Sequence, residues 1–596
     1  MAQPASPLIP ALVFVPNLRA ARGMGHLKRC LKAAASAGSA AVYFAGDPEL
    51  VGDRPVFEAR LVEELARQSG VKLLREWPSG LRVPTVVADL QASSPSAFQF
   101  LRERSKRLVG WDEGGPFRDR FPFLVDSLPH DAQPAPNVRL PGLLGLRVVP
   151  GQAFQRPIRT VLAVFGGADP AGLTLRFLRF TDRLRAQGRW PYALTVVRGP
   201  LSRFIVPSGT QVLEAPRELS ALLGGYDLVV TSWGLTALES LAAGTPVVLL
   251  NPTAYHEHLT RAAGLPSFGV RSPRASAFWD AIDEAPTAAA RAFVTLLRPP
   301  QDAGAYFAGD HGSDGRCPVC HTGGHRVLAR TEHKSYHRCS VCAMEYLSAH
   351  RLPAKEYSEA YFFEDYQKQY GKTYLDDFAH IQGLGRQRLA FLDGTFGAKP
   401  GRRILDAGCA YGPFLAAAAG AGHRPFGLDV AEAAVSHVRQ VLGFPAVQAS
   451  FLDFRWSEAF PGEPLPDVLT LWYVIEHFPD LDLVLRQANS LLPVGGVLAF
   501  STPNARGITR RFQPEKFWRE SPDDHFSLWS PQNSRSVLRR YGFEVSAFRI
   551  TGHHPERYPG LKRASGWKYA IVSALDRWFG WGDTFEVYAC KTKEPS

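Results

Sequence analysis

Short apolar stretches alternate with helical stretches through the first half of the chain. The apolar stretches are Ala11–Val15, Ala40–Phe44, Thr85–Ala88, Thr160–Phe165, Ala193–Val197, Leu228–Thr231 and Pro246–Leu250. This alternation predicts a parallel α/β architecture. The pattern restarts near Arg159 after a proline-rich passage. We therefore expect two similar halves, residues 1–152 and 153–300, facing a cleft and followed by a Gly/Asp-rich linker at 301–315.

A second strand–turn–helix pattern opens the region 398–596. The apolar run Arg403-Ile-Leu leads into Asp406-Ala-Gly-Cys-Ala-Tyr-Gly412, and a small-residue stretch starting at Pro413 follows. Glycine is needed where a backbone turns sharply against a ligand. The turn lacks the dinucleotide fingerprint for a pyrophosphate. An acid at its start suits a ligand with an ammonium group and hydroxyls, and Asp429, one unit later, suits ribose hydroxyls.

These motifs resemble those of class I S-adenosylmethionine-dependent methyltransferases. The likeness runs from about Ala398 to Lys591, and its departure is Ala410, where the family often has a third glycine. The closing stretch Thr584–Cys590 fits the antiparallel edge strand typical of this methyltransferase fold. The resemblance implies that Asp406, Gly408 and Gly412 hold the methionine part, with Asp429 on the ribose and Asp453 at the adenine. The matching motifs are Asp406–Gly412, Asp429, Phe451–Asp453, Trp472–His477 and Leu492–Gly496.

Methyl transfer to an oxygen also requires loss of a proton. His477, just past a predicted strand end, is the natural candidate base, and related enzymes carry a Glu-His pair at this place. The alternative is that His477 only hydrogen-bonds within the structure. His525 is a second candidate, since this loop lines the acceptor side in the family.

Two Cys-x-x-Cys pairs predict a metal site. Cys317 and Cys320 are followed, after eighteen intervening residues, by Cys339 and Cys342. Four thiolates at this separation indicate one tetrahedral, structural zinc, with a redox role as the minor alternative. The segment 316–350 resembles the zinc-ribbon leader of a sugar- and small-molecule-modifying methyltransferase family. Four histidines in the ribbon are expected to be surface residues: His321, His325, His333 and His337.

A tyrosine-rich segment at 351–397 joins the ribbon to the methyltransferase region. In related methyltransferases such a segment forms a lid over the donor pocket, although aromatic packing onto the core is the better interpretation for most of these side chains. The tyrosines are spaced by four or five residues, as on one helix face: Tyr357, Tyr361, Tyr366, Tyr370 and Tyr374.

Two segments within residues 1–300 contain candidate site residues. His26 follows a glycine at the expected start of a helix, where the helix dipole favours neutral imidazole, the form that a general base needs. A capping or packing histidine is the alternative. Gly234 and Thr236 begin another helix, whose N–H groups suit a diphosphate. Glu239 suits ribose hydroxyls or is a solvated helix residue.

Together these residues resemble GT-B enzymes, in particular the UDP-sugar hydrolase of pseudaminic acid biosynthesis. The likeness covers Leu12 to about Val270 and includes Asp89, Asp112-Glu113 and Gly166–Thr174. It implies that His26 activates water or an acceptor hydroxyl, and that Gly234, Thr236 and Glu239 hold a nucleotide sugar, UDP-linked by this likeness. Two departures put the hydrolase activity in doubt: Trp233, and Tyr255-His-Glu-His258 in place of an Asn-Gln pair.

Composition excludes few classes of protein. The chain has 596 residues, 45% of them hydrophobic, and a net charge of +12 spread along its length. No Lys/Arg block is present, so we expect no nucleic-acid partner. No apolar run approaches the ~18 residues of a spanning helix, and the N-terminus lacks the charged region of a signal peptide, which predicts a cytoplasmic protein. The Trp-rich stretch 567–581 is either a peripheral membrane contact or a helix over the acceptor pocket.

The sequence thus predicts an α/β multidomain enzyme: two Rossmann-like halves of GT-B type, a small zinc ribbon and a Rossmann-like class I methyltransferase domain. We expect it to pair methyl transfer to a sugar or glycan hydroxyl with nucleotide-sugar hydrolysis or glycosyl transfer. Alternatively, residues 1–300 only bind a nucleotide sugar, or the ribbon belongs to a nucleic-acid-binding scaffold. Oligomeric state is not indicated.

Overall fold

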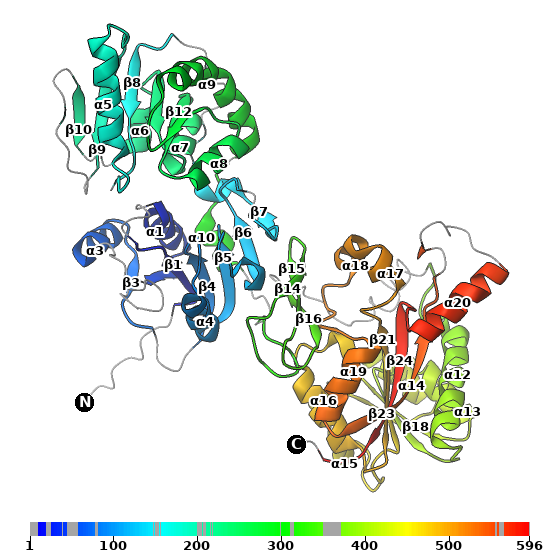
Figure 1. Cartoon of the computed structure of the whole chain (residues 1–596). Coiled ribbons are helices and arrows are strands. Elements are labelled where there is room, and N and C mark those ends of the chain that lie inside the picture. Colours follow the sequence, from blue (N-terminus) through cyan, green and yellow to red (C-terminus); the bar gives the residue numbers. More distant parts are fainter. Residues whose placement is uncertain are drawn as a thin grey trace, which may run out of the picture. The chain divides into compact units, whose positions relative to one another are not determined.

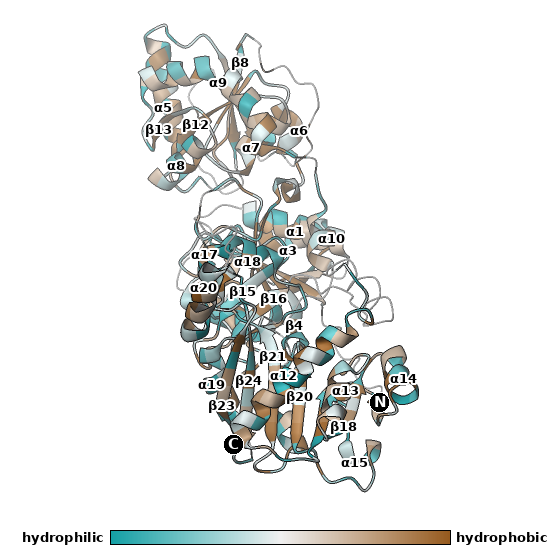
Figure 2. Ribbon diagram, turned by 90° about the vertical axis from the view of Figure 1, so that its right-hand side faces the viewer, coloured by the Kyte–Doolittle hydropathy of each residue, from teal (hydrophilic) through white to brown (hydrophobic). Residues whose placement is uncertain are grey.

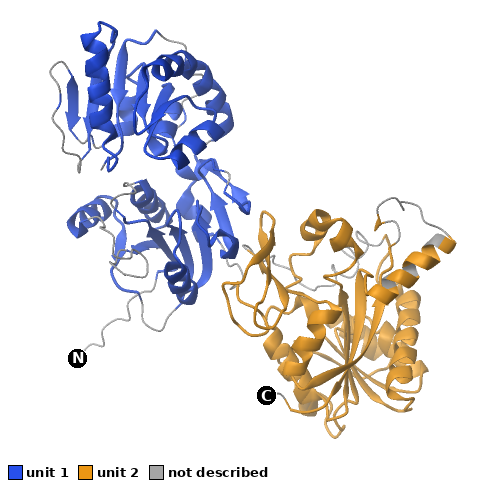
Figure 3. Cartoon of the chain, viewed as in Figure 1, with its two compact units in different colours: residues 1–310 blue, residues 311–596 orange. Residues whose placement is uncertain are grey.

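The computed structural model divides the chain into two compact units, residues 1–310 and 311–596 (Figure 3). The described residues run from 10 to 594, with gaps at 20–24, 39, 44–57, 78–81, 131, 147, 149–153, 155–156, 168, 200–205, 207–209, 215, 217, 299, 310–314, 350–370, 555–556 and 559–565.

The first sheet of unit 1 is parallel, in the order β3-β2-β1-β4-β5-β6-β7 (Figure 1). Its inner strands are buried on both faces, as expected for a parallel sheet between helices. Its strands are β1 Leu12–Pro16, β2 Ala40–Tyr43, β3 Lys72–Leu74, β4 Val83–Asp89, β5 Ser105–Trp111, β6 Phe123–Asp126 and β7 Val138–Arg139. Its helices are α1 Gly25–Ala37, α3 Ala59–Gln68, α4 Pro95–Arg104 and α10 Ala303–Ala308.

The predicted linker at 301–315 is partly helical. Helix α10 returns to the first sheet, where Phe307 is fully buried with its ring centroid 5.8 Å from Phe14 and 5.1 Å from Trp111. The prediction that residues 301–315 form a linker was therefore wrong for residues 303–308. The glycine-rich composition of this stretch hid the short apolar face of α10.

The second sheet of unit 1 is also parallel, in the order β10-β9-β8-β11-β12-β13. The parallel architecture expected for residues 1–300 is thus confirmed. Its strands are β8 Thr160–Ala163, β9 Ala193–Arg198, β10 Gln211–Glu214, β11 Leu228–Thr231, β12 Val247–Asn251 and β13 Ser267–Val270. Its helices are α5 Leu173–Ala186, α6 Leu219–Leu223, α7 Leu235–Ala242, α8 Ala254–Ala262 and α9 Ala275–Leu296.

Unit 2 is built on a seven-stranded sheet in the order β19-β18-β17-β20-β21-β24-β23. The first five of these strands are parallel, whereas β24 runs antiparallel to both of its neighbours. The strands are mainly brown in Figure 2, the colour of apolar residues. They are β17 Arg403–Ala407, β18 Arg424–Asp429, β19 Ala446–Gln448, β20 Val468–Trp472, β21 Val497–Pro503, β23 Phe543–Thr551 and β24 Thr584–Lys591.

The last strand was expected at the sheet edge. Strand β24 is antiparallel as predicted, but it lies between β21 and β23, so the edge prediction was wrong. Its burial pattern, with six of eight residues buried, is that of an inner strand. The helices of unit 2 are α12 Phe378–Phe396, α13 Pro413–Gly420, α14 Glu432–Gln440, α15 Trp456–Ala459, α16 Leu481–Leu491, α17 Ile508–Phe512, α18 Pro514–Glu520, α19 Pro531–Arg540 and α20 Trp567–Phe579.

The four-cysteine segment forms a small sheet that is continuous with unit 2. Its three strands pair antiparallel, and a fourth strand from a distant part of the sequence completes the sheet, in the order β14-β15-β16-β22. The ribbon is therefore integrated into unit 2. The strands are β14 Val327–Arg330, β15 Lys334–Arg338, β16 Glu345–Ala349 and β22 Ser527–Leu528.

Candidate active site

The turn from β17 to α13 requires glycine at two positions. Gly408 and Gly412 adopt φ of +78° and +82°, a left-handed backbone conformation that residues other than glycine rarely adopt. A Cβ on Gly408 would lie 2.5 Å from Cγ2 of Val474, and one on Gly412 would lie 2.7 Å from Cδ1 of Leu442. Ala410 is also left-handed, at φ +46°. The turn is therefore a tight backbone cradle between two strands.

Asp406 is buried inside this cradle. Its Oδ1 accepts a hydrogen bond from Thr470 Oγ1 at 2.6 Å, and burial raises the pKa of Asp406 to about 7. Asp429 raises this pKa further, whereas Arg388 opposes the rise. A buried carboxylate with so little compensation is complementary to a cationic ligand.

Asp429, the last residue of β18, holds the turn in place. Its Oδ2 accepts from the Ala410 N–H at 2.8 Å, and its Oδ1 accepts from the Ala431 N–H at 2.9 Å. Burial raises the pKa of Asp429. Each oxygen keeps a further lone pair for a ribose hydroxyl. Ribose binding stays a prediction, and no sequence signal indicated the contacts with the N–H groups of Ala410 and Ala431.

The other acids and bases gather at the same edge of the sheet. Because β17 to β20 are parallel, their carboxyl ends meet there. Asp453 is exposed in a turn after β19. His477 ends the short helix η5 (Ile475–His477), just after β20.

The structure brings His477 and His525 together. Their ring centroids are 4.8 Å apart at 82°, and His477 Nδ1 lies 3.2 Å from Oδ2 of Asp524. His477 and Asp524 are 21% and 11% exposed at their side chains. The carboxylate thus lies at ion-pair distance from one histidine nitrogen, where it can orient an imidazole that acts as a base.

Glu476 completes this cluster. It is 1% exposed, its carboxylate lies beside Thr502, and it has no regular hydrogen bond from any residue in the described part of the chain. Burial raises the pKa of Glu476 to about 7, and His477 opposes the rise. The sequence predictions do not include Glu476 or Asp524 among the functional residues. Their sequence signals are their positions next to the two histidines.

Of the lid tyrosines, the structure describes Tyr374. Its ring packs 6.1 Å from Tyr411 of the glycine turn. Tyr374 and Leu375 cover Ala410 and Ala431, so this segment adjoins the cradle. The remaining lid tyrosines lie outside the described residues: Tyr357, Tyr361, Tyr366 and Tyr370.

A family model described as a methyltransferase domain matches residues 379–547. The ubiquinone biosynthesis O-methyltransferase of Bordetella bronchiseptica is 30% identical over 186 residues, which are 30% of this chain and 77% of that protein. The chain belongs to the S-adenosylmethionine-dependent methyltransferases. The Bordetella avium protein of the same name is 30% identical over 194 residues, with the same coverage. A solved methyltransferase from Archaeoglobus fulgidus is 17% identical, covers 38% of this chain and 98% of its own, and has a TM-score of 0.28.

The methyltransferase unit uses S-adenosylmethionine, and its residues fit this cofactor. The cradle is too narrow for a Cβ at Gly408, and Asp406 offers a cation a buried carboxyl group that Thr470 and Arg388 compensate only in part. Asp406, Gly408 and Asp429 would hold the cofactor, which supplies an activated methyl group on a sulfonium.

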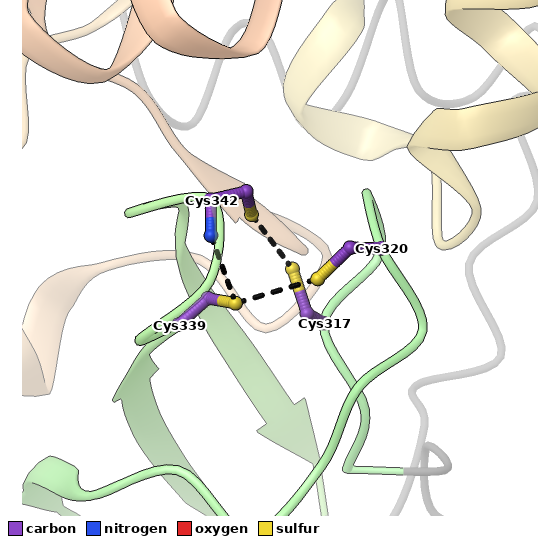
Figure 4. A group of neighbouring side chains, drawn as sticks. All are labelled: Cys317, Cys320, Cys339 and Cys342. Carbon is purple, nitrogen blue, oxygen red and sulfur yellow. Dashed lines mark hydrogen bonds between the residues drawn. The ribbon is translucent and has the colours of Figure 1, made fainter. Parts of the chain in front are cut away.

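The four ribbon cysteines point toward one another (Figure 4). All four sulfurs lie within 4.8 Å of each other, and the pairs Cys317–Cys342 and Cys320–Cys339 are 3.4 Å apart. A tetrahedral zinc with ~2.3 Å bonds places sulfurs about 3.8 Å apart. The site therefore fits zinc.

Two of the ribbon histidines are not surface residues. His325 and His337 are 6% and 1% exposed, so that prediction was wrong for them, whereas His321 and His333 are exposed. His325 Nε2 lies 3.0 Å from Thr322 Oγ1, which lies 2.9 Å from Cys320 Sγ. The sequence could not distinguish a histidine that supports a ligand from an exposed one.

In unit 1, His26 is the second residue of α1. Its Nδ1 lies 2.6 Å from Oδ1 of Asp89, which ends β4 and is fully buried. Arg29, one turn later, donates to both oxygens of Asp89 and, at 2.6 Å, to Oδ2 of Asp112. Burial alone would raise the pKa of Asp89, but Arg29 and His26 hold it at about 2. A permanent carboxylate thus orients the His26 ring.

The residues of unit 1 that are predicted to bind a nucleotide sugar lie at the start of α7. Gly234 precedes the helix and Thr236 is its second residue. Burial raises the pKa of Glu239, and Lys28 and Lys32 of α1 oppose the rise. A Cβ on Gly25 would lie 3.3 Å from Leu235 Cδ1, so the starts of α1 and α7 adjoin. The departure Trp233 is buried in the core, and its backbone N–H donates to Oδ1 of Asn251.

Helix α20 exposes an apolar stripe. Trp567, Ile571, Leu575 and Trp578 follow helical spacing and are 70%, 50%, 44% and 86% exposed. None of the helices in the described residues has the length and hydropathy to span a membrane.

Proposed function

We propose that the methyltransferase unit methylates a hydroxyl oxygen of a sugar or glycan. The contact between His477 Nδ1 and Asp524 carries this proposal, because it orients a base at the edge where the cofactor cradle opens. The relatives named as O-methyltransferases support an oxygen acceptor. The sugar is proposed from the pairing with a nucleotide-sugar unit, which is an associational argument.

In the proposed reaction, the acceptor oxygen forms a bond to the methyl carbon as the bond between that carbon and sulfur breaks. The hydroxyl proton passes to Nε2 of His477, and Asp524 stabilises the charge that develops on the imidazole. Buried Glu476, beside His477, adds negative potential. Alignment supplies much of the acceleration for such a displacement, since it replaces a bimolecular encounter.

The test is an acceptor screen with methyl-labelled S-adenosylmethionine, in which the product is located by NMR. Sugar hydroxyls and phenolic hydroxyls form separate arms, because the curated relatives act in ubiquinone biosynthesis. Label on a sugar oxygen supports the proposal. Label confined to phenols overturns the sugar assignment, and label on carbon overturns the oxygen assignment.

A second activity is proposed for unit 1: hydrolysis or transfer of a nucleotide sugar by a GT-B-type domain. The oriented His26–Asp89 pair favours this over a unit that only binds its ligand. The start of α7, with Gly234 and Thr236, would hold the diphosphate, and Glu239 the ribose.

This second proposal is tested by nucleotide release from UDP-sugars. His26→Gln is expected to abolish release while nucleotide binding remains. If the native chain binds the nucleotide but never releases it from a sugar, unit 1 is a binding module.

Two further assignments belong to the same proposal. The four ribbon cysteines hold a structural zinc, and the exposed stripe of α20 contacts a membrane surface that presents a lipid-linked acceptor. The zinc assignment is supported by the four sulfurs, which lie within 4.8 Å of one another. The membrane assignment is supported by the exposed, Trp-rich face of α20.

A further inference from the structure

Each Cys-x-x-Cys pair of the ribbon contacts one of the two segments that carry the histidines. The first pair contacts the segment after His477: the Pro318 carbonyl accepts from the N–H groups of Leu481 and Asp482, at 2.9 and 3.0 Å. These residues begin α16, four positions after His477. A helix start has free N–H groups, and here the ribbon satisfies two of them.

The second pair contacts the segment of His525. Strand β16 begins at Glu345, three residues after Cys342, and pairs with β22 through Glu345–Leu528 and Tyr346–Ser527. Lys334 of β15 adds an ion pair of 2.7 Å with Asp523 and donates to the Ser521 carbonyl. The loop before β22 is therefore attached to the ribbon on both sides of His525.

Phe526 joins the ribbon to the histidine cluster. Its carbonyl accepts from the Leu347 N–H of β16 at 3.0 Å, and its own N–H donates to the Glu476 carbonyl at 2.8 Å. The two backbone groups of one residue thus connect β16 with the turn that carries His477. His525 is the preceding residue, so its position follows from both bonds.

We propose that the metal-loaded ribbon positions the acceptor site by fixing the spacing between His477 and His525. The metal would join the two Cys-x-x-Cys pairs, whose sulfurs already lie 3.4 Å apart across the pairs. Because each pair holds one histidine segment, joining the pairs joins the segments. The ribbon residues are then positioning residues for the methyl transfer, and this inference rests on the role proposed for His477.

The cofactor cradle has a different support. Gly408 donates its N–H to the Leu428 carbonyl at 2.7 Å, and Ala410 donates to Asp429. These contacts lie within β17 and β18 and their turns. Loss of the metal should therefore affect the acceptor site and spare cofactor binding, a split that general unfolding would not produce.

The experiment compares the native full chain, the chain after chelation and the Cys320→Ser variant. Metal content is measured by mass spectrometry, cofactor binding by calorimetry, and exchange of segments 475–482 and 522–528 by hydrogen–deuterium exchange. We expect one zinc per chain, cofactor affinity within about twofold, and faster exchange in both segments after metal loss. The turnover number should fall by about 10- to 100-fold.

A milder variant guards against misfolding. Lys334→Met removes the ion pair with Asp523 and keeps all four cysteines; its control is Lys399→Met, which removes a 3.2 Å pair with Asp467 at the opposite ends of the strands. Faster exchange of 522–528 is expected only in Lys334→Met. Unchanged exchange in both histidine segments after metal loss, or a chain without zinc, overturns the inference. Faster exchange without methyl transfer to any acceptor would retain the positioning role and refute the proposed function.

Discussion

The Nδ1 atom of His477 lies 3.2 Å from Oδ2 of Asp524, although the two residues belong to different segments of the chain. The contact depends on the ribbon sheet, because β22 follows Asp524 and pairs with β16. The base proposed for methyl transfer thus combines a histidine from the turn after β20 with an aspartate from the loop before β22.

The first prediction concerns this pair. His477→Gln should lower the turnover number by about 10²–10⁴, the usual contribution of a general base. Asp524→Asn should lower it less, because the imidazole remains but loses its oriented carboxylate. Cofactor affinity, measured by calorimetry, should stay unchanged in both variants. Equal turnover in His477→Gln and the native chain would remove the base assignment.

The second prediction concerns pH. With the pKa of Asp406 at about 7, a cationic cofactor favours the ionised form, so binding must release a proton below that pH. Affinity for S-adenosylmethionine should therefore rise between pH 6 and 8. Asp406→Asn should bind more weakly and lose most of this dependence. Calorimetry in buffers of different ionisation enthalpy measures the released proton, and its absence contradicts the prediction.

The third prediction compares two glycines. Gly408→Ala places a Cβ 2.5 Å from Val474 at a left-handed position, and should cost about 1–3 kcal/mol and abolish cofactor binding. Gly394→Ala, in the last turn of α12 with no atom within 4 Å of its Cβ, should stabilise by about 0.5–1 kcal/mol. Thermal unfolding monitored with and without cofactor separates the two effects. Similar behaviour of the two variants would mean that the turn is not a tight cradle.

The fourth prediction concerns the buried ions of unit 1. Arg29→Met leaves Asp89 and Asp112 without their shared cation and should destabilise unit 1 by about 3–5 kcal/mol. Arg67→Met, which removes an exposed pair with Glu64, should have no measurable effect. Hydrogen exchange in β1 and β4 reports the difference. Equal protection in both variants would contradict it.

The fifth prediction concerns α20. Trp578→Ser, at the most exposed position of the stripe, should reduce binding of the full chain to anionic vesicles in a sedimentation assay. Val494→Ser, an exposed apolar side chain in the turn before β21, is the matched control. No vesicle binding by the native chain would assign the stripe to another partner.

The sequence predicted most of the architecture because the relevant signals are local. In residues 1–300, apolar runs located seven strands to within a few residues: β1, β2, β4, β8, β9, β11 and β12. The turn Asp406–Gly412 identified the cofactor region. Strands β3, β7 and β19 were not anticipated, since two or three residues leave almost no periodic pattern. The longer strands β5, β6, β10 and β13 were also missed.

The non-local contacts were beyond a reading of the sequence. His477 and His525 were separate candidates until the structure placed their rings 4.8 Å apart. Likewise, the sequence indicated Asp89 only as part of a family likeness. Its contact with His26 comes from the pairing of β1 with β4. The insertion of β24 between β21 and β23 has the same origin, because strand order depends on which neighbours cover an apolar face.

The measurement that tests the account most directly is a single-turnover methyl transfer by the full chain, with labelled S-adenosylmethionine and a hydroxylated acceptor. The native chain and His477→Gln should bind the cofactor equally. We predict transfer to oxygen in the native chain and a rate at least about 100-fold lower in the variant. Transfer at the same rate in both, or transfer to an atom other than oxygen, would contradict the account.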